Sequence, residues 1–421
     1  MEAFNELMFF IVALVRDYWW VAAPFLALGI FWEIWVQYTD LEFDIHSHGV
    51  LLEVKLPQEL AKQSAPAMDH VISAFSHVYK QPMLYEKYLQ GMGYSGYSLE
   101  IAGIEGEVRF FIRCPQERKR YSISQIYAQF PGAEVSEVED YTKKVPLDIK
   151  TNPDSEWDVW GTEFMFLKED AYPLRTYVDF AMDKPGEEEE RVDPLAGIVE
   201  ALGTCGPGEH FWYQIIVKPT FSTWEKQAEE IINKLSGRKE KKKASRVEKV
   251  FGLLDKTVQA TLGQPIEEEK KPEDEFPKMR VWTDPETQQM KALDRKRSKV
   301  GFRCVVRVLY VCKKEILNKR HAQGMFGFFR PFSTAYNALI PDRRNITSQD
   351  YFFVPLRVEA RKRDLLWRYR SRSTRAPGVL LNTEELATMF HIPGKEVSAP
   401  QVIRMEAKRA TAPVGVPRPP A

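Results

Sequence analysis

The longest apolar stretch of the chain is YWWVAAPFLALGIFWEIWV, which runs from Tyr18 to Val36. About twenty apolar residues, each rising about 1.5 Å along a helix, match the hydrocarbon core of a bilayer. Tryptophans near both ends are typical of membrane interfaces, and Glu33 lies where a carboxylate can reach the headgroups. The pattern predicts a transmembrane helix over 18–38, preceded by an N-terminal segment over 1–17. A buried core helix and a cleaved signal peptide are the alternatives.

A compact pattern over 47–148 predicts an α+β unit. Two apolar stripes at helical spacing lie between stretches of alternating apolar and polar residues, two of which are joined by a tight turn at Glu105-Gly106. The predicted strands take up residues 51–56, 99–101, 108–112 and 133–138, and the predicted helices take up residues 68–79 and 123–130. The order is β-α-β-β-α-β, which is the ferredoxin-like arrangement.

A second unit of the same kind is predicted over 149–345. Its main strands are expected at 162–167, 210–217 and 300–312. A charged insertion at about 224–298, with the runs RKEKKK and EEEKKPEDE, is expected to be solvated helix or disorder. The predicted fold class is therefore α+β: an N-terminal transmembrane helix, then two ferredoxin-like units, the second with a long charged insertion.

Arginine and aromatic residues are interleaved in the last segment, 346–421, within the stretch RVEARKRDLLWRYRSRSTR. This combination suits phosphate neutralisation with base stacking, and it equally suits anionic lipid headgroups or an acidic protein surface. The alternative is a helix that packs its apolar residues inward and presents arginine to solvent. The residues predicted to bind polyanions are Arg357, Arg361, Arg363, Arg368, Arg370, Arg372, Arg375, Trp367 and Tyr369.

A short helix is predicted at NTEELATMF, where Asn382 and Glu385 have the spacing of a capping box. A helix this short cannot bury its apolar side chains by itself, so they pack either on the second α+β unit or on another protein. The residues predicted to dock on a partner are Leu386, Met389, Phe390 and Ile392. A tail rich in proline and basic residues follows.

The formal net charge is zero, with 59 Lys and Arg against 59 Asp and Glu, but basic residues outnumber acidic ones after residue 300. The charges that flank the apolar stretch are too balanced to set its orientation by the positive-inside rule. The four cysteines form no CxxC pair, which favours reduced thiols. We therefore expect the body of the protein to lie in the cytoplasm.

The sequence carries no motif of a known catalytic centre. Gly394-Lys395 is the nearest fragment of a phosphate-binding loop, but Met389 stands where the first glycine of that motif belongs. GxSxG, HExxH and paired zinc motifs are absent, and the DxHxH spacing at 44–48 has no third ligand nearby. The sequence thus predicts a protein that is not an enzyme and that holds no cofactor or metal.

Several long phrases, among them LLEVKLP, SLEIAGIEGEVRFFIRCP and VDPLAGIVEALG, resemble an uncharacterised family of membrane-anchored bacterial proteins known mainly from candidate-phylum bacteria. That family is similar to the region that precedes the motor domain in conjugative coupling proteins and HerA-type ATPases of type IV secretion. The stretch VLLNTEELATMFHIPGKEVSAP looks like the segment just before the ATPase. The resemblance covers Leu51 to Pro400, and it implies that any ATP-driven step comes from a separate polypeptide.

Two functions are expected on these grounds. The first is a non-catalytic component of a type IV secretion or DNA-transfer machine, anchored in the bacterial cell membrane by a single span and partnered with a separate P-loop ATPase. The second is a membrane-tethered protein that binds nucleic acid or anionic lipid and has no motor partner.

Overall fold

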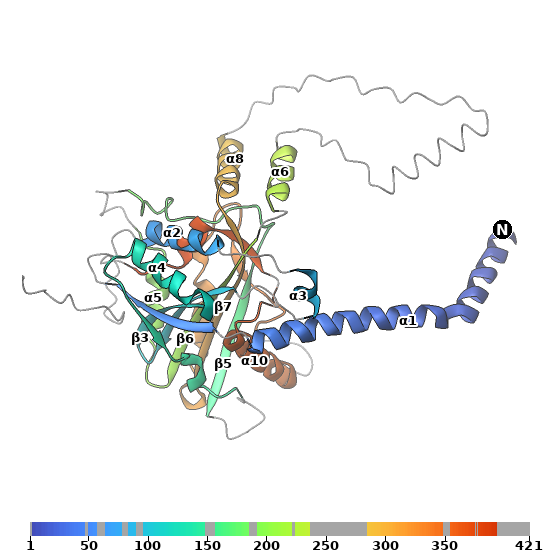
Figure 1. The fold of residues 1–421 in the computed structure, drawn as a ribbon, viewed down its shortest axis with the longest axis horizontal. Coiled ribbons are helices and arrows are strands. Elements are labelled where there is room, and N and C mark those ends of the chain that lie inside the picture. Colours follow the sequence, from blue (N-terminus) through green and yellow to red (C-terminus); the bar gives the residue numbers. More distant parts are fainter. Residues whose placement is uncertain are drawn as a thin grey trace, which may run out of the picture.

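The computed structural model describes residues 2–46, 49–56, 64–77, 83–89, 96–147, 156–184, 192–220, 224–235, 284–347, 354–374, 376 and 378–393. Arg375, most of the predicted charged insertion and the proline-rich tail lie outside these residues. Figure 1 shows a body built around one sheet, from which helix α1 (Glu2–His46) projects on one side and helices α6 (Trp224–Leu235) and α8 (Asp284–Arg297) on another.

Helix α1 contains the whole apolar stretch as one continuous helix. It contacts the short helix α3 (Leu84–Leu89), because Trp35 Nε1 donates to the carbonyl of Tyr88 at 3.0 Å and the rings of Trp32 and Tyr88 lie 5.5 Å apart. Within the part of the chain that is described, no helix has both the length and the apolar character needed to cross a membrane. The predicted transmembrane helix over 18–38 therefore has no support from the structure.

The first half of the body has the predicted order β-α-β-β-α-β, with α3 added before the second strand. Its elements are β1 (Gly49–Lys55), α2 (Ser64–Ser76), β2 (Tyr97–Ile104), β3 (Glu107–Pro115), α4 (Lys119–Gln129) and β4 (Glu134–Val138). The predicted turn between β2 and β3 is present, since Glu105 and Gly106 both have left-handed φ angles, of 52° and 93°. Two successive residues with positive φ are the mark of the tight turn that suits the twist of a hairpin.

The second half repeats this order around the charged insertion. Its elements are β5 (Trp157–Phe166), α5 (Ala196–Gly203), β6 (Glu209–Pro219), β7 (Gly301–Lys313), α9 (Lys319–Gly324) and β8 (Leu339–Pro341). Helices α6 and α8 lie between β6 and β7 in the chain and begin and end the insertion. A 3-10 turn occupies Lys314–Ile316 directly after β7, and α9 follows it.

All of these strands form one antiparallel sheet, in the order β4-β1-β3-β2-β6-β7-β5-β8. A ninth strand, β9 (Val379–Asn382), pairs with the first residues of β7. Each half has the relative order of a split βαβ unit, and the halves are joined where β2 pairs with β6. The α+β class is confirmed, but two separate units were predicted and a single sheet is observed. The physical reason is that each half ends on an edge strand whose backbone N–H and C=O groups need partners.

Apolar side chains cover both faces of the sheet. One face packs on α2, α5 and the short helix α11 (Thr383–Met389), and it includes alternate residues of β7 from Phe302 to Cys312. The opposite face packs on α10 (Val354–Ser371) through Leu365, Leu366 and Tyr369. Because both faces are covered, the central strands β2, β6 and β7 are buried along nearly their whole length.

Helix α11 lies inside the body. The four side chains predicted to dock on a partner are 0–4% exposed and belong to the main core: Leu386, Met389, Phe390 and Ile392. The predicted capping box at Asn382 and Glu385 is present. Buried hydrogen bonds hold the segment in place, since Ser64 Oγ donates to the carbonyl of Ile392 at 2.5 Å and the Tyr213 hydroxyl donates to that of Met389 at 3.0 Å. The docking prediction is therefore corrected: these groups pack within the chain.

Candidate functional site

A row of polar side chains crosses the middle of the sheet on the face that α10 covers. Glu100 on β2 lies opposite Gln214 on β6, which lies opposite Arg307 on β7, which lies opposite Glu163 on β5. The four side chains are at most 2% exposed. Gln214 Nε2 donates to Glu100 Oε1 at 3.1 Å, and Arg307 Nε donates to Glu163 Oε1 at 2.7 Å. Burial of these charges is tolerated because each has a partner of opposite sign.

Two arginines complete this row at its ends: Arg368 in the last turn of α10 and Arg372 directly after the helix. Arg372 Nε and Nη2 donate to the two carboxylate oxygens of Glu100, each at 3.0 Å, and Arg372 also pairs with Asp140. Arg368 Nη1 donates to Glu163 at 3.3 Å. Arg372 has a left-handed φ of 54° directly after the helix, a position where glycine is usual. We infer that the ion pairs outweigh this backbone cost.

Burial and neighbouring charges shift the pKa values of Glu100 and Tyr141 in this network. Burial favours the neutral form of Glu100, but the charge and hydrogen bonds of Arg372 outweigh it and lower the pKa of Glu100. Burial and the charge of Glu100 raise the pKa of Tyr141, whose hydroxyl donates to Glu100 at 2.8 Å and lies 2.7 Å from that of Tyr369. The ion pairs of this network fix the C-terminal end of α10 on the sheet.

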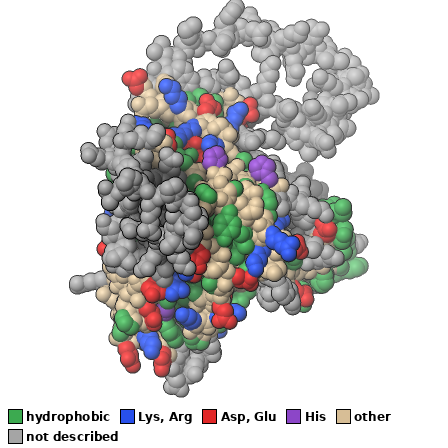
Figure 2. Space-filling model, turned by 60° about the vertical axis from the view of Figure 1, so that its left-hand side comes forward, with side chains coloured by type: hydrophobic (Ala, Val, Ile, Leu, Met, Phe, Trp, Pro, Cys, Tyr) green, Lys and Arg blue, Asp and Glu red, His purple; other side chains and the backbone are tan. Residues whose placement is uncertain are grey.

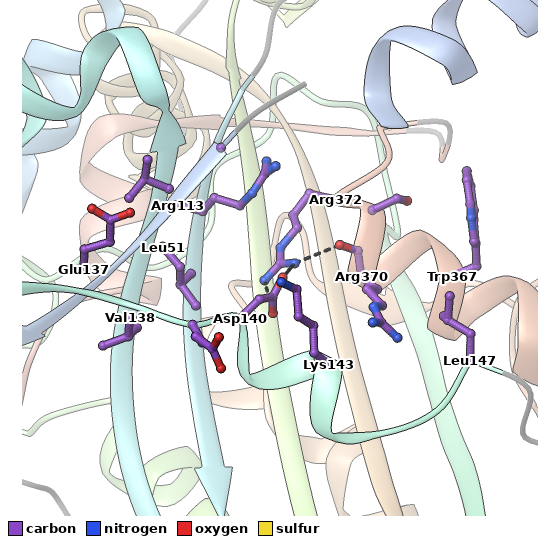
Figure 3. Close-up of a pocket in the computed structure, with 14 residues that line it drawn as sticks. Leu51, Arg113, Glu137, Val138, Asp140, Lys143, Leu147, Trp367, Arg370 and Arg372 are labelled. Carbon is purple, nitrogen blue, oxygen red and sulfur yellow. Dashed lines mark hydrogen bonds and ion pairs between the residues drawn. The ribbon is translucent and has the colours of Figure 1, made fainter. Parts of the chain in front are cut away.

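A pocket of about 670 Å³ opens beside this network, between the outer strands and the end of α10. Its walls come from the start of β1, the ends of β3 and β4, Lys143 in the 3-10 turn η3 (Tyr141–Lys144), the last turn of α10, and Arg372 after it. Figure 3 shows Arg113 and Lys143 on the side of the strands and of η3, and Arg370 and Trp367 on the side of α10, with Arg372 between them. The charged residues of the lining are Arg113, Glu137, Glu139, Asp140, Lys143, Arg370 and Arg372.

The residues of the stretch predicted to bind polyanions have different surroundings in the structure. Tyr369 is fully buried, and Arg361 Nη1 donates to the carbonyl of Ile346 at 3.0 Å. Arg357 and Arg363 are exposed on the outer face of α10. Arg368 and Arg372 form the ion pairs described above. Arg372 also lines the pocket, together with Trp367 and Arg370. The prediction of binding stays a prediction, now confined to a smaller set of residues.

Sequence reasoning missed Arg113 and Lys143. Arg113 alternates with the apolar residues of β3, so the sequence shows only that it lies on the opposite face from Ile112. Nothing in the local pattern shows that α10 covers that face. Lys143 follows β4 in a turn whose position depends on Tyr141, which packs against Phe111 with ring centroids 5.0 Å apart.

A second notable surface is formed by α1 and α3. Large apolar side chains are exposed along α1, including Phe25, Leu26, Leu28, Ile30, Phe31 and Ile34, at 58–72%. The neighbouring α3 segment adds Met83, Leu84, Tyr85 and Leu89, at 52–76% exposure. By contrast, Figure 2 shows Lys and Arg interspersed with Asp and Glu over the visible described surface of the body, without an extended area of one sign.

The described residues include no cluster of side chains suited to metal binding. No group of three or more His, Cys, Asp or Glu side chains there could hold a metal ion. The four cysteines are unpaired and buried. Burial raises the pKa of the Cys205 thiol to about 12, so it is not a reactive thiolate at neutral pH.

One family model matches residues 37–405, and its description is a domain of unknown function, DUF8128. The chain belongs to this family. The DUF8128 match takes in the whole sheet, α10 and α11, together with the pocket, and it begins near the end of α1. Among curated proteins, none is similar enough to this chain to count as a match.

Proposed function

We propose that this protein is a non-catalytic, membrane-associated binding protein, in which α1 and α3 contact lipid and hold the α+β body at the membrane surface. The observation that carries the proposal is the distribution of exposed apolar side chains around α1. At 100° per residue, Phe25, Leu26, Leu28, Ile30 and Phe31 point to all sides of the helix axis. A helix that is apolar all round is either buried in protein or in contact with lipid.

A protein partner explains this distribution less well than lipid does. A single docked partner covers one face of a helix, whereas lipid chains surround it. The exposed apolar residues of α3 extend the same surface, because α3 is held against α1 by the contacts of Tyr88 with Trp32 and Trp35. Helices that bind in the plane of the interface have one apolar and one polar face, so apolar side chains on all sides of α1 favour immersion in lipid over interfacial binding.

Flotation of the purified chain with neutral phosphatidylcholine vesicles tests this proposal. The double variant Leu26→Glu and Ile30→Glu places two carboxylates where residues 67% and 62% exposed now stand. We expect the parent to float and the variant to remain with the soluble fraction. Leu356→Glu is the matched control, because Leu356 is 70% exposed but lies on α10. Equal flotation of parent and double variant refutes lipid contact through α1.

The stronger form of the proposal is the single-pass anchor over 18–38 in a bacterial cell membrane, with the body in the cytoplasm. Extraction of isolated membranes with alkaline carbonate separates the two forms. A spanning helix stays in the membrane pellet, and a helix bound in the interface is released. Release of the full chain refutes the span and leaves the interfacial form.

A role beside a separate P-loop ATPase of a type IV secretion machine is also proposed, and it is supported by the resemblance of the chain to the region before such motors. Since Leu386 and Phe390 are buried, the contact must use other surfaces. Co-purification with the ATPase of the same gene cluster tests this role, and absence of the ATPase from cross-linked membranes refutes it.

A further inference from the structure

We propose that a basic surface on α10 binds the anionic headgroups of the membrane that α1 enters. The surface consists of Arg357, Arg361 and Arg363 on α10 and Arg343 in the turn beside the helix. The choice of lipid as the partner rests on the membrane association proposed above, whereas the excess of cations is a property of the surface alone.

The contact of α1 with α3 places this surface near the lipid. Trp32 and Trp35 contact Tyr88, so the body is held beside the end of the apolar stretch at Val36. Aromatic residues at the end of such a stretch lie at the level of the headgroups. Figure 1 shows α3 and α10 on the side of the body from which α1 projects, whereas α4 lies on the opposite side. A bilayer entered by α1 therefore faces the side of the body that carries α10.

The turn over 342–346 and α10 form one surface. Arg361 Nη1 donates to the carbonyl of Ile346 at 3.0 Å, which holds the turn against the helix. Burial, and then the charge of Arg357 one helical turn away, lower the pKa of Arg361. Guanidinium groups that repel each other in this way are stabilised by an anion that lies close to both.

The surface has more cations than carboxylates. Arg343, Arg357 and Arg363 are exposed, and none of them forms an ion pair with a residue that the structure describes. The other charged residues around them are paired with each other. The pairs are Asp342 with Arg344 at 2.8 Å, Asp364 with Arg368 at 2.7 Å, Glu163 with Arg307 at 2.7 Å, and Asp158 with Lys362 at 2.6 Å. Within the described residues 342–347 and 354–371, Glu359 is the one carboxylate outside these pairs, and the surface sets four arginines against it.

The aromatic side chains of α10 decide between lipid and nucleic acid. Binding of single strands without sequence preference combines cations with exposed rings on which the bases stack. Tyr369 is fully buried, and Trp367 is half-buried in the wall of the pocket, so neither ring is exposed beside the arginines. Cations without stacking rings suit the headgroups of anionic lipids, which attract each arginine near the membrane surface.

Sedimentation of the full chain with vesicles tests the surface. The variant Leu26→Glu and Ile30→Glu serves as the background, because it removes binding through α1. We expect this background to bind vesicles of equal parts phosphatidylglycerol and phosphatidylcholine at least about tenfold more tightly than vesicles of phosphatidylcholine alone. High salt should abolish the difference, because exposed charges are then screened.

Two sets of substitutions in this background separate the surface from net charge. The surface variant carries Arg343→Gln, Arg357→Gln and Arg363→Gln. The matched control carries Arg120→Gln, Lys291→Gln and Arg297→Gln, which remove three exposed charges from α4 and α8. We expect the surface variant to bind the anionic vesicles at least about tenfold more weakly than the background, and the control less than about twofold more weakly. Both should keep the unfolding temperature of the background, since all six side chains are exposed.

Binding by the surface variant that equals that of the background overturns the proposal. An equal loss in the control overturns it as well, because net charge alone then acts. A surface variant that loses binding of single-stranded DNA but keeps binding of anionic vesicles assigns the arginines to nucleic acid and overturns lipid as the partner.

Flotation with neutral vesicles distinguishes failure of this proposal from failure of lipid contact through α1. If the parent floats with phosphatidylcholine but the background binds no anionic vesicles, the basic surface is refuted and contact through α1 is supported. If the background binds anionic vesicles through the three arginines but the parent does not float with neutral ones, contact through α1 is refuted and the basic surface is supported.

Discussion

Replacement of Arg372 by methionine tests whether the buried network holds α10 on the sheet. Methionine keeps an unbranched side chain and the same left-handed backbone, so the main change is loss of the guanidinium. Glu100, which is 0% exposed, then loses both of its 3.0 Å hydrogen bonds to Arg372. Glu100 keeps hydrogen bonds from Gln214 and Tyr141 but loses its paired guanidinium, and removal of one partner from a buried ion pair costs about 3–5 kcal/mol.

Arg368→Met is the matched control on the same helix. Its partner Glu163 retains Arg307 at 2.7 Å and Asn345 at 2.5 Å, so no buried charge is left alone. We expect a loss of at most about 1 kcal/mol, as for other partly exposed ion pairs. The double variant Arg372→Met with Glu100→Gln should recover about 2–3 kcal/mol relative to the sum of the two single changes, since the isolated charge is then absent.

Urea unfolding followed by far-ultraviolet circular dichroism measures these differences. With a slope of about 3 kcal/mol per molar urea, Arg372→Met should lower the midpoint by about 1–1.7 M, and Arg368→Met by less than about 0.4 M. Equal shifts in the two variants contradict the argument, because they show that burial of the Glu100 charge does not determine the cost. Additivity in the double variant contradicts it as well.

Two further predictions concern the core. Because the pKa values of Glu100 and Asp140 are lowered in the folded state, their contribution to stability is present above about pH 4.3. It is lost as pH falls through the folded pKa values. Acid titration of the urea midpoint should show this loss, and the Glu100→Gln variant should show a smaller one. Phe390→Ala should cost about 3–5 kcal/mol of stability, since Phe390 is 1% exposed and packs edge-on against Phe110, whereas Leu356→Ala should change stability by less than about 0.5 kcal/mol. Thermal unfolding of both variants checks this, and an unchanged unfolding temperature for Phe390→Ala restores the idea of an exposed docking helix.

Patterns of neighbouring residues along the chain were sufficient to predict most helices and strands of the body. The alternation along 300–312 puts Phe302 and Cys312 on one face of β7, as observed, because side chains in a strand point to opposite faces in turn. The positive φ angles at Glu105-Gly106 and the capping box at Asn382 and Glu385 also follow from nearby residues alone. Each of these features depends on contacts within a few residues, which a single sequence displays directly.

Contacts between distant segments were decided by the tertiary structure. The pairing of β2 with β6 joins residues more than a hundred positions apart, and no local pattern identifies one buried strand as the neighbour of another. The same holds for the segment from α11 to Ile392. Its apolar residues fit equally well in a core or at an interface until the hydrogen bonds of Ile392 with Ser64 and of Met389 with Tyr213 are known. The arginines of α10 share one sequence pattern but have different surroundings. Arg372 is buried against Glu100, because it faces the sheet that α10 covers. Arg363 is exposed, because it lies on the outer face of α10.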